Sequence, residues 1–244
     1  MGPTVQPQTT SGSPSFINDV LDVFNVLHEP TAVFNRIKER SRILAPWVVL
    51  SVLFIVTSIL TRPYQQAAFE AFRATLSPEQ AARMGNRGGG GGLVGLLFTP
   101  GLVFIALAIG TGVLWIGVSL SGTQARYKTL LSILAYSCIT YVLFSVVTIL
   151  VFTVRGKQSI TGFADLRAPL GLDLFVPGAG LYLGTVLNGI NPFSAWGVWL
   201  TGTGISITHG TSRTTAIVLT AAAFVLCLVI LAVPTLFLSM LTKQ

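Results

Sequence analysis

The residues best suited to chemistry are few and widely separated. His28 and His209 are the two histidines, and neither stands in a Gly-x-Ser-x-Gly, His-Glu-x-x-His or paired-aspartate setting. The two cysteines, Cys138 and Cys227, lack the spacing of a metal site or of a disulfide framework, so we expect buried structural thiols. We therefore predict no catalytic residue, no metal ligand, no cofactor and no enzymatic activity.

Two other patterns could hold a ligand. The glycine run from Gly88 to Gly92 has no Lys-Ser or Lys-Thr after it and no predicted strand before it, so we interpret it as a flexible hinge. Polar residues between Tyr136 and Tyr141 interrupt a long apolar stretch and could line a pathway. We favour the alternative that these groups bond to a neighbouring helix or to carbonyls of their own helix, at about 0.6 kcal/mol each.

The composition indicates that lipid surrounds most of the chain. Of the 244 residues, 52% are hydrophobic and 9% are charged, whereas a soluble domain carries about 25% charged residues. The mean hydropathy is +0.75. The net charge of +7 is scattered along the chain rather than gathered in one patch, which favours anionic lipid headgroups over nucleic acid as the counterpart.

Long uncharged segments predict where the chain crosses the bilayer. A spanning helix needs about 20 apolar residues, each rising about 1.5 Å. We predict an all-α integral membrane protein, a polytopic bundle of about five transmembrane helices with an amphipathic interfacial helix at its amino terminus. The transmembrane domain covers 43–242, with spans at about 43–61, 93–120, 129–154, 193–208 and 214–241.

The segment before the first predicted span is divided into two parts. Residues 1–15 are polar and predict a disordered tail. Residues 16–42 form an amphipathic basic segment, whose cations Arg36, Lys38, Arg40 and Arg42 would gain up to about 1 kcal/mol each from anionic lipid. The alternative is a solvated helix that only caps the bundle. The same cations predict a cytoplasmic amino terminus.

The stretch before the predicted fourth span is uncharged but broken. Glycines are frequent from Leu174 to Thr208, and Asn191-Pro192 interrupts the run. We expect a short interfacial or re-entrant helix over Gly180 to Leu187, and then a new helix from Phe193.

Two motifs in this order resemble the Yip-domain (Ypt-interacting) family of membrane proteins. The first is His28 to Lys38, HEPTAVFNRIK, in which a proline and a phenylalanine precede a basic helix and the first span. The second is Asn191 to Leu200, NPFSAWGVWL, followed by Gly204 and by TSRTTA at 211–216. One departure is Thr140, where we would expect a proline in a bacterial member.

The resemblance implies a helical membrane bundle with a cytosolic amino terminus. Eukaryotic members act at endoplasmic reticulum and Golgi membranes, where they associate with small prenylated GTPases and with each other, so a GTPase partner applies only to a eukaryotic chain. Bacterial members have no such GTPase system. The composition here, rich in arginine and glycine and poor in lysine, favours a bacterial cytoplasmic (inner) membrane protein.

Two functional hypotheses follow. The first is a membrane organiser or adaptor that acts through helix–helix and protein–protein contacts, with the lipid bilayer and a homo- or hetero-oligomeric membrane partner as its ligands. The second is a small-solute or ion transporter that uses the broken helix near Asn191-Pro192. Against it, no Asp, Glu, Lys, Arg or His lies firmly within a predicted span.

The site residues that we nominate fall into two groups. Trp196 is either a recognition residue or only an interfacial anchor. The membrane-interface and recognition group is Pro30, Phe34, Arg36, Lys38, Arg40 and Trp47, and the structural and binding group is Asn191, Pro192, Phe193, Trp196 and Arg213.

Overall fold

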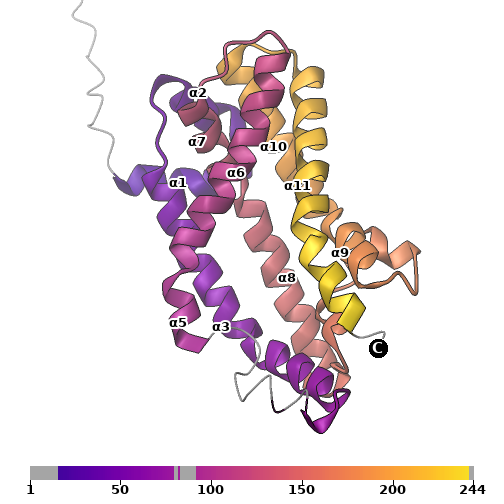
Figure 1. Ribbon diagram of the computed structural model, residues 1–244. Coiled ribbons are helices and arrows are strands. Elements are labelled where there is room, and N and C mark those ends of the chain that lie inside the picture. The colour runs from indigo at the N-terminus through magenta and orange to yellow at the C-terminus, as the bar shows by residue number, and fades with distance from the viewer. Residues whose placement is uncertain (1–15, 80–81, 83–91, 242–244) are drawn as a thin grey trace, which may run out of the picture.

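The regular structure of the chain is helical throughout the part that the computed structural model describes, residues 16–79, 82 and 92–241. The all-α prediction is thereby confirmed for these residues, whereas the predicted tail at 1–15 lies outside them. The helices are α1 (Phe16–Asn25), α2 (Pro30–Glu39), α3 (Leu44–Ala74), α5 (Gly92–Leu97), α6 (Thr99–Leu120), α7 (Tyr127–Ser137), α8 (Ile139–Arg155), α9 (Leu181–Gly189), α10 (Pro192–His209) and α11 (Arg213–Leu241), with short 3-10 turns η1 (Lys157–Ser159), η2 (Phe163–Leu166) and η3 (Leu172–Phe175) (Figure 1).

Four helical segments in the described residues are long and apolar enough to cross a membrane. They are Leu44–Ala74, Thr99–Leu120, Tyr127–Arg155 and Arg213–Leu236, the third of which joins α7 and α8. Only 22–28% of the most apolar window of each segment is buried. The other residues of these windows are partly or largely exposed although they are mostly apolar, as expected where hydrocarbon rather than water is the solvent.

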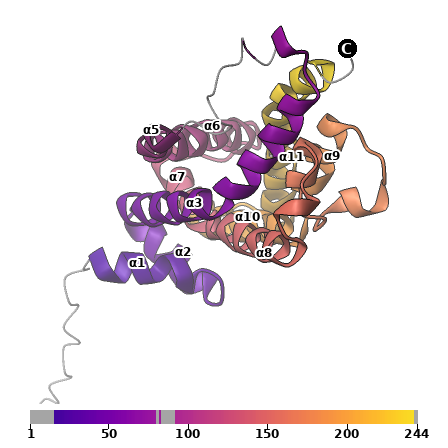
Figure 2. The same cartoon turned by 90° about the horizontal axis from the view of Figure 1, so that it is seen from below.

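The fifth predicted span, 193–208, is a helix of a different kind. This helix, α10, is not among the four candidate membrane spans, and it packs against α2, α7, α8 and α11. Nine of its 18 residues are buried. Seen from below, α10 lies within the bundle, whereas α1 and α2 lie across one side of it (Figure 2). The buried residues of α10 are mostly glycine, serine and threonine, whose small side chains allow close helix contacts.

The first span is longer than the sequence predicts. We placed its end at Thr61 because the charged Arg62 follows, but α3 continues through Arg62 and Pro63 to Ala74. Its extension is held by packing. The ring of Tyr64 lies 5.2 Å from that of Phe152, and the buried Phe72 ring lies 5.2 Å from that of Phe163 in η2. These contacts outweigh the local preference of Pro63 to end a helix.

The region between α8 and α10 folds against the bundle. It contains η1, η2 and η3 and then α9, a helix where a short one was expected. A Cβ atom on Gly171 would lie 2.6 Å from the Asn188 carbonyl oxygen, so the backbones meet there without room for a side chain. The Asn188 amide donates to the Ala168 carbonyl and to both Asp173 carboxylate oxygens, which ties this region together.

Candidate functional site

Apart from Trp47 in α3, the first group of nominated residues lies in the hairpin formed by α1 and α2. One ion pair joins the two helices, and a second joins α1 to the segment before α3. Asp22 of α1 accepts hydrogen bonds from Nε of Arg36 at 2.9 Å and from Nη2 at 2.7 Å. Asp19 of α1 pairs with Arg42, which lies just before α3. A guanidinium that binds both oxygens of one carboxylate fixes direction as well as distance. The pairs therefore set how α1 lies on its neighbours.

These pairs change the electrostatics predicted for residues 16–42. The segment contains four acidic residues, Asp19, Asp22, Glu29 and Glu39, which offset its four cations to a formal charge of zero. Lys38 and Arg40 are exposed and form no ion pair within the part of the chain that the structure describes. Attraction to anionic lipid would therefore rest on these two residues and on Lys128, which borders the same surface hollow as Arg40.

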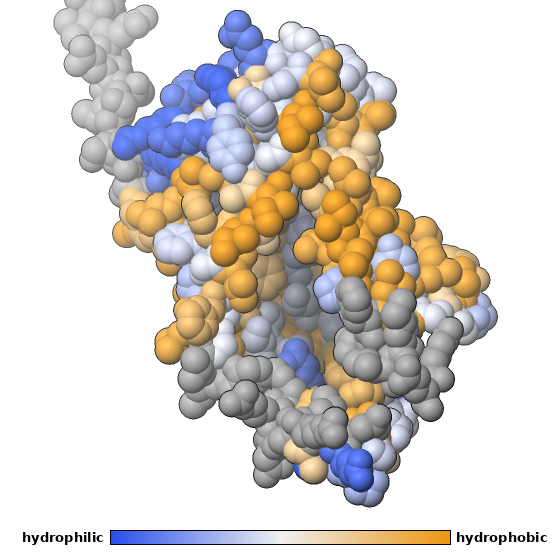
Figure 3. Space-filling model, viewed as in Figure 1, coloured by the Kyte–Doolittle hydropathy of each residue, from blue (hydrophilic) through white to orange (hydrophobic). Residues whose placement is uncertain are grey.

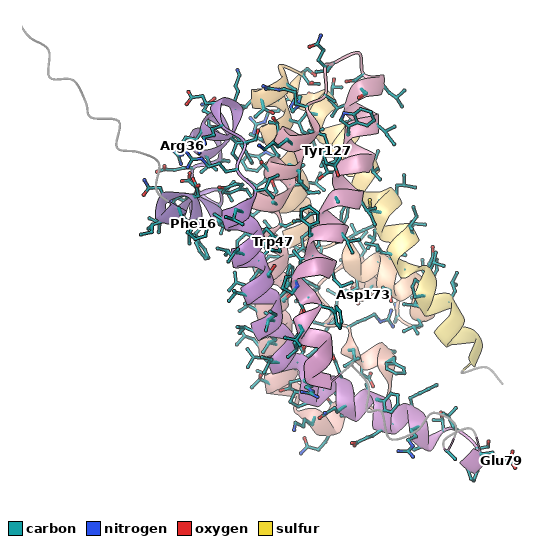
Figure 4. All side chains as sticks on the ribbon, turned by 60° about the vertical axis from the view of Figure 1, so that its left-hand side comes forward. Phe16, Arg36, Trp47, Glu79, Tyr127 and Asp173 are labelled. Atoms are coloured by element: carbon teal, nitrogen blue, oxygen red, sulfur yellow. The ribbon has the colours of Figure 1, made fainter. Side chains whose placement is uncertain are left out.

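The outward face of α1 is apolar. Phe16, Ile17, Leu21 and Phe24 are between 45% and 67% exposed, while Val23 on the protein-facing side of the helix is fully buried. Figure 4 shows Phe16 and Arg36 at the same corner of the molecule, with Glu79 at the far end. A short helix with one face on the protein and an apolar face directed outward is typical of a segment in a membrane interface.

Phe34 lies in the core of the protein rather than at its surface. Its side chain is fully buried, and a Cβ atom on Gly204 of α10 would lie 3.0 Å from its Cε1 atom. Pro30 is the first residue of α2, where its missing N–H removes no helical hydrogen bond. The motif that carries the resemblance therefore packs α2 onto α10.

Trp47 also makes a contact between helices. Its indole N–H donates to the Pro100 carbonyl at 3.0 Å, and its ring meets Phe104 of α6 edge-on, with centroids 6.4 Å apart. The side chain therefore ties α3 to the beginning of α6.

The second group begins with a cap on α10. The Asn191 side-chain oxygen accepts from the backbone N–H groups of Phe193 and Ser194, both at 3.0 Å, and the Ser194 hydroxyl accepts from the Asn191 N–H at 2.9 Å. The Asn191 amide group donates to the carbonyls of Asn188 and Gly189. With Pro192 at the first helical position, this reciprocal cap starts the buried helix.

The remaining residues of the second group are spread along α10 and its neighbours. The ring of Phe193 lies 6.1 Å from that of Phe144 in α8, and Trp196 packs half-buried against the core. The guanidinium carbon of Arg213 lies 5.3 Å from the centre of the Trp199 ring, a cation–π contact. Trp199 was not nominated from the sequence, although Trp-x-x-Trp on one helix is a signal that could have found it.

A polar network closes the other end of α10. Nε2 of His209 accepts from the Arg126 backbone N–H at 3.2 Å, and Nδ1 lies 2.7 Å from the Thr208 hydroxyl, which itself donates to the Gly204 carbonyl. The Arg126 side chain donates to the Thr208 carbonyl. Burial, and then the charge of Arg126, lower the pKa of His209 below its ordinary value. The neutral imidazole is the form that accepts this bond.

The structure does not bring the two nominated groups together. Phe34 meets α10 at Gly204, and Asn191 lies 13 positions earlier, a separation of about 20 Å along a helix. At Thr140, where a proline was expected, the hydroxyl donates to the Ser137 carbonyl, and a Cβ atom on Gly197 would lie 2.7 Å from its oxygen. A hydroxyl against a glycine therefore packs α8 onto α10.

Two features were missed or differ from expectation. Asp19 and Asp22 were not nominated from the sequence, although their spacing of three places them on one helix face. Cys138 and Cys227 are free thiols and half-buried rather than fully buried. No group of three His, Cys, Asp or Glu residues that could hold a metal ion occurs among residues 16–79, 82 and 92–241.

Comparison with known proteins adds a family match. A sequence model of the family described as the Yip1 domain matches residues 24–233, a range that includes both motifs His28 to Lys38 and Asn191 to Leu200. The chain is similar to the membrane protein YknW of Bacillus subtilis (strain 168), with 27% identity over 195 residues that cover 78% of this chain and 80% of that one. No solved structure shows a significant match.

Proposed function

Because the chain belongs to the Yip1 domain family of membrane proteins, as the sequence motifs predicted, we propose that it is a membrane organiser or adaptor without enzymatic activity. In this role the α1–α2 hairpin lies in the membrane interface, and the outer faces of the spans bind a second copy or another membrane protein. The similarity to a Bacillus membrane protein supports a place in a bacterial cytoplasmic membrane. The amino terminus faces the cytoplasm.

The observation that carries the proposal is the outward apolar face of α1. Two ion pairs hold this helix across the bundle, and no described segment covers Phe16, Ile17, Leu21 or Phe24. A soluble domain would bury such a face, whereas a membrane interface accepts its apolar side chains and leaves the charges of α2 in water.

The outer face of α6 supports a contact with another membrane helix. A Cβ atom on Gly112 or on Gly101 would meet no other atom within 4 Å, and both residues lie on the side of α6 that carries the exposed Ile105. Small residues at such positions let two helix backbones approach, which is the main source of association in lipid. We assign the protein–protein contact to this face.

We further propose that α10 crosses the membrane as a fifth helix that protein shields from lipid. Its 18 residues span about 27 Å, close to the thickness of the hydrocarbon core of about 30 Å. Its caps support this arrangement, because Asn191 and the His209 network satisfy polar groups at both ends.

Photo-cross-linking in native membranes tests the organiser role. A photoreactive residue at Ile116, exposed on α6 one turn after Gly112, is expected to give a discrete protein adduct, and the same residue at Leu21 is expected to give lipid adducts. Gly112→Leu should abolish the protein adduct, whereas the matched change Ala222→Leu, on the exposed side of α11, should not. The proposal is wrong if Ile116 yields no protein adduct, or if both variants behave alike.

The transporter hypothesis has less support from the geometry. Both polar atoms of the Asn191 side chain are engaged in the cap of α10, so they do not coordinate an ion without breaking it. A flux assay in proteoliposomes distinguishes the two functions. A solute flux that exceeds the background and is lost in Asn191→Ala would favour transport.

A further inference from the structure

A large apolar cavity lies inside the bundle and is not used by the organiser role. Its volume is about 440 Å³, within the range of about 300–1,000 Å³ of small-molecule sites. Five parts of the fold line it: α3, α6 from Thr99 to Leu114, the junction of α7 and α8, α10 and α11. No charged residue is among the lining residues.

The cavity opens sideways, between α6 and α11. Figure 3 shows the surface hollowed between two hydrophobic ridges that follow these helices. Both helices belong to the candidate membrane spans, and their outward residues, such as Ile109 on α6 and Leu226 on α11, are exposed and apolar. The opening therefore meets the hydrocarbon of the bilayer, and whatever enters comes from there.

One polar group on the cavity wall lacks a partner. Ser137, at the end of α7, is 2% exposed, and its hydroxyl has no hydrogen bond within the described residues. The Thr220 hydroxyl on the same wall differs, because it donates to the carbonyl four residues earlier in its own helix. An unpaired hydroxyl that is buried away from water is unfavourable, and a ligand oxygen would satisfy it.

We propose that this cavity binds a neutral long-chain lipid, with an uncharged carbonyl or hydroxyl oxygen of the lipid against the Ser137 hydroxyl and the chain leaving between α6 and α11. The apolar wall excludes water from competing for Ser137 and accepts the chain. A phosphate, carboxylate or ammonium head does not fit, because no lining side chain would pair its charge.

Photolabelling of the full chain in lipid nanodiscs tests the site. The probe is a photoactivatable long-chain alcohol, and the control probe is the permanently charged trimethylammonium analogue with the same chain. We expect saturable labelling by the alcohol at cavity-lining residues of α6, α8 or α11, identified by mass spectrometry, and labelling by the charged analogue outside the cavity only. Equal labelling of the cavity by both probes would overturn the proposal.

Two pairs of variants locate the ligand. Ala106→Phe fills the cavity from α6 and should reduce the labelling at least about fivefold, whereas its neighbour Ile105→Phe, which points outward, should not. Ser137→Ala should weaken the apparent affinity about threefold to tenfold, the effect of one hydrogen bond.

The same Ser137→Ala variant separates ligand binding from a structural role. Without ligand its melting temperature should equal or exceed that of the parent, because the change removes an unpaired buried hydroxyl. Ser132→Ala, which loses a hydrogen bond to the Lys128 carbonyl, should instead lower the melting temperature and leave labelling unchanged. An unchanged affinity in Ser137→Ala, or undiminished labelling in Ala106→Phe, would refute the assigned position of the lipid.

Discussion

The α1–α2 hairpin and α10 carry the two family motifs, yet they meet their surroundings in opposite ways. On α1 apolar side chains such as Ile17 point outward and are held there by ion pairs underneath. On α10 glycine and threonine residues are buried, and their small size allows four other helices to approach. In lipid, the apolar character of a residue therefore does not decide whether it is buried, and the approach of neighbouring helices does.

This difference marks what could be predicted from the sequence. The four long spans followed from the length of uncharged apolar runs, and the start of a new helix near Phe193 followed from the interruption at Asn191-Pro192. The central position of α10 did not follow, because the absence of charge in 193–208 is equally typical of a lipid-facing span. Its low hydropathy could have indicated burial in protein.

The nominated site residues show the same limit. The sequence identifies Phe34 and Trp47 as unusual, but only the tertiary contacts to Gly204 and Pro100 show that both hold helices together. The neutralisation of the basic segment could have been predicted by counting Asp19 and Asp22 with the cations. The cavity could not, because its lining comes from five separate parts of the fold.

The largest difference in stability is expected between two variants that each replace one phenylalanine of the hairpin by alanine, one on its buried face and one on its exposed face. Phe34→Ala removes a fully buried ring and should lower the free energy of unfolding by about 3–5 kcal/mol. Phe24→Ala, on the exposed face of α1, should change it by no more than about 0.5 kcal/mol. Denaturant unfolding in detergent micelles measures both. Similar losses in the two variants would show that α1 and α2 are buried alike, contrary to the comparison.

A somewhat smaller effect is expected where α10 meets α11. A Cβ atom on Gly202 would lie 2.8 Å from Cα and 3.0 Å from N of Ile217, and this backbone cannot move aside without cost. Gly202→Ala should therefore destabilise the protein by about 1–3 kcal/mol. Gly112→Ala, where the new methyl meets nothing within 4 Å, should be neutral or gain up to about 1 kcal/mol from helix propensity. If Gly112→Ala lowered the free energy of unfolding as much as Gly202→Ala, close packing at Gly202 would not be the cause of the loss.

The cap of α10 should contribute about 1 kcal/mol. Asn191→Ala removes the acceptor for two backbone N–H groups and should destabilise the protein by about 0.5–2 kcal/mol. Asn191→Asp keeps the accepting oxygen and should recover part of the loss, although it gives up the bonds to Asn188 and Gly189. The free energy of unfolding should therefore be higher for Asn191→Asp than for Asn191→Ala, and the reverse order would contradict this account of the cap.

The ion pair between Asp22 and Arg36 is expected to be weaker than any contact of α10. The Arg36 side chain is 52% exposed, so solvent screens the pair. A double-mutant cycle with Asp22→Asn and Arg36→Gln should give a coupling of about 0.2–1 kcal/mol that decreases as salt is added. The main effect of losing the pair should be on the orientation of α1. A photoreactive residue at Leu21 should therefore lose its lipid adducts in the double variant. A coupling that salt does not change would place the pair in a less exposed environment.

The smallest expected effect is a pH dependence at the far end of α10. The pKa of His209 is lowered from its ordinary 6.5, so between pH 6.5 and the lowered value the unfolded chain binds a proton that the folded chain does not. Stability should therefore fall as the pH decreases through this interval, because a protonated ring cannot accept from the Arg126 N–H. His209→Gln should reduce this slope in melting temperatures measured between pH 7.5 and 5. A slope that His209→Gln leaves unchanged would assign the pH dependence to groups outside α10.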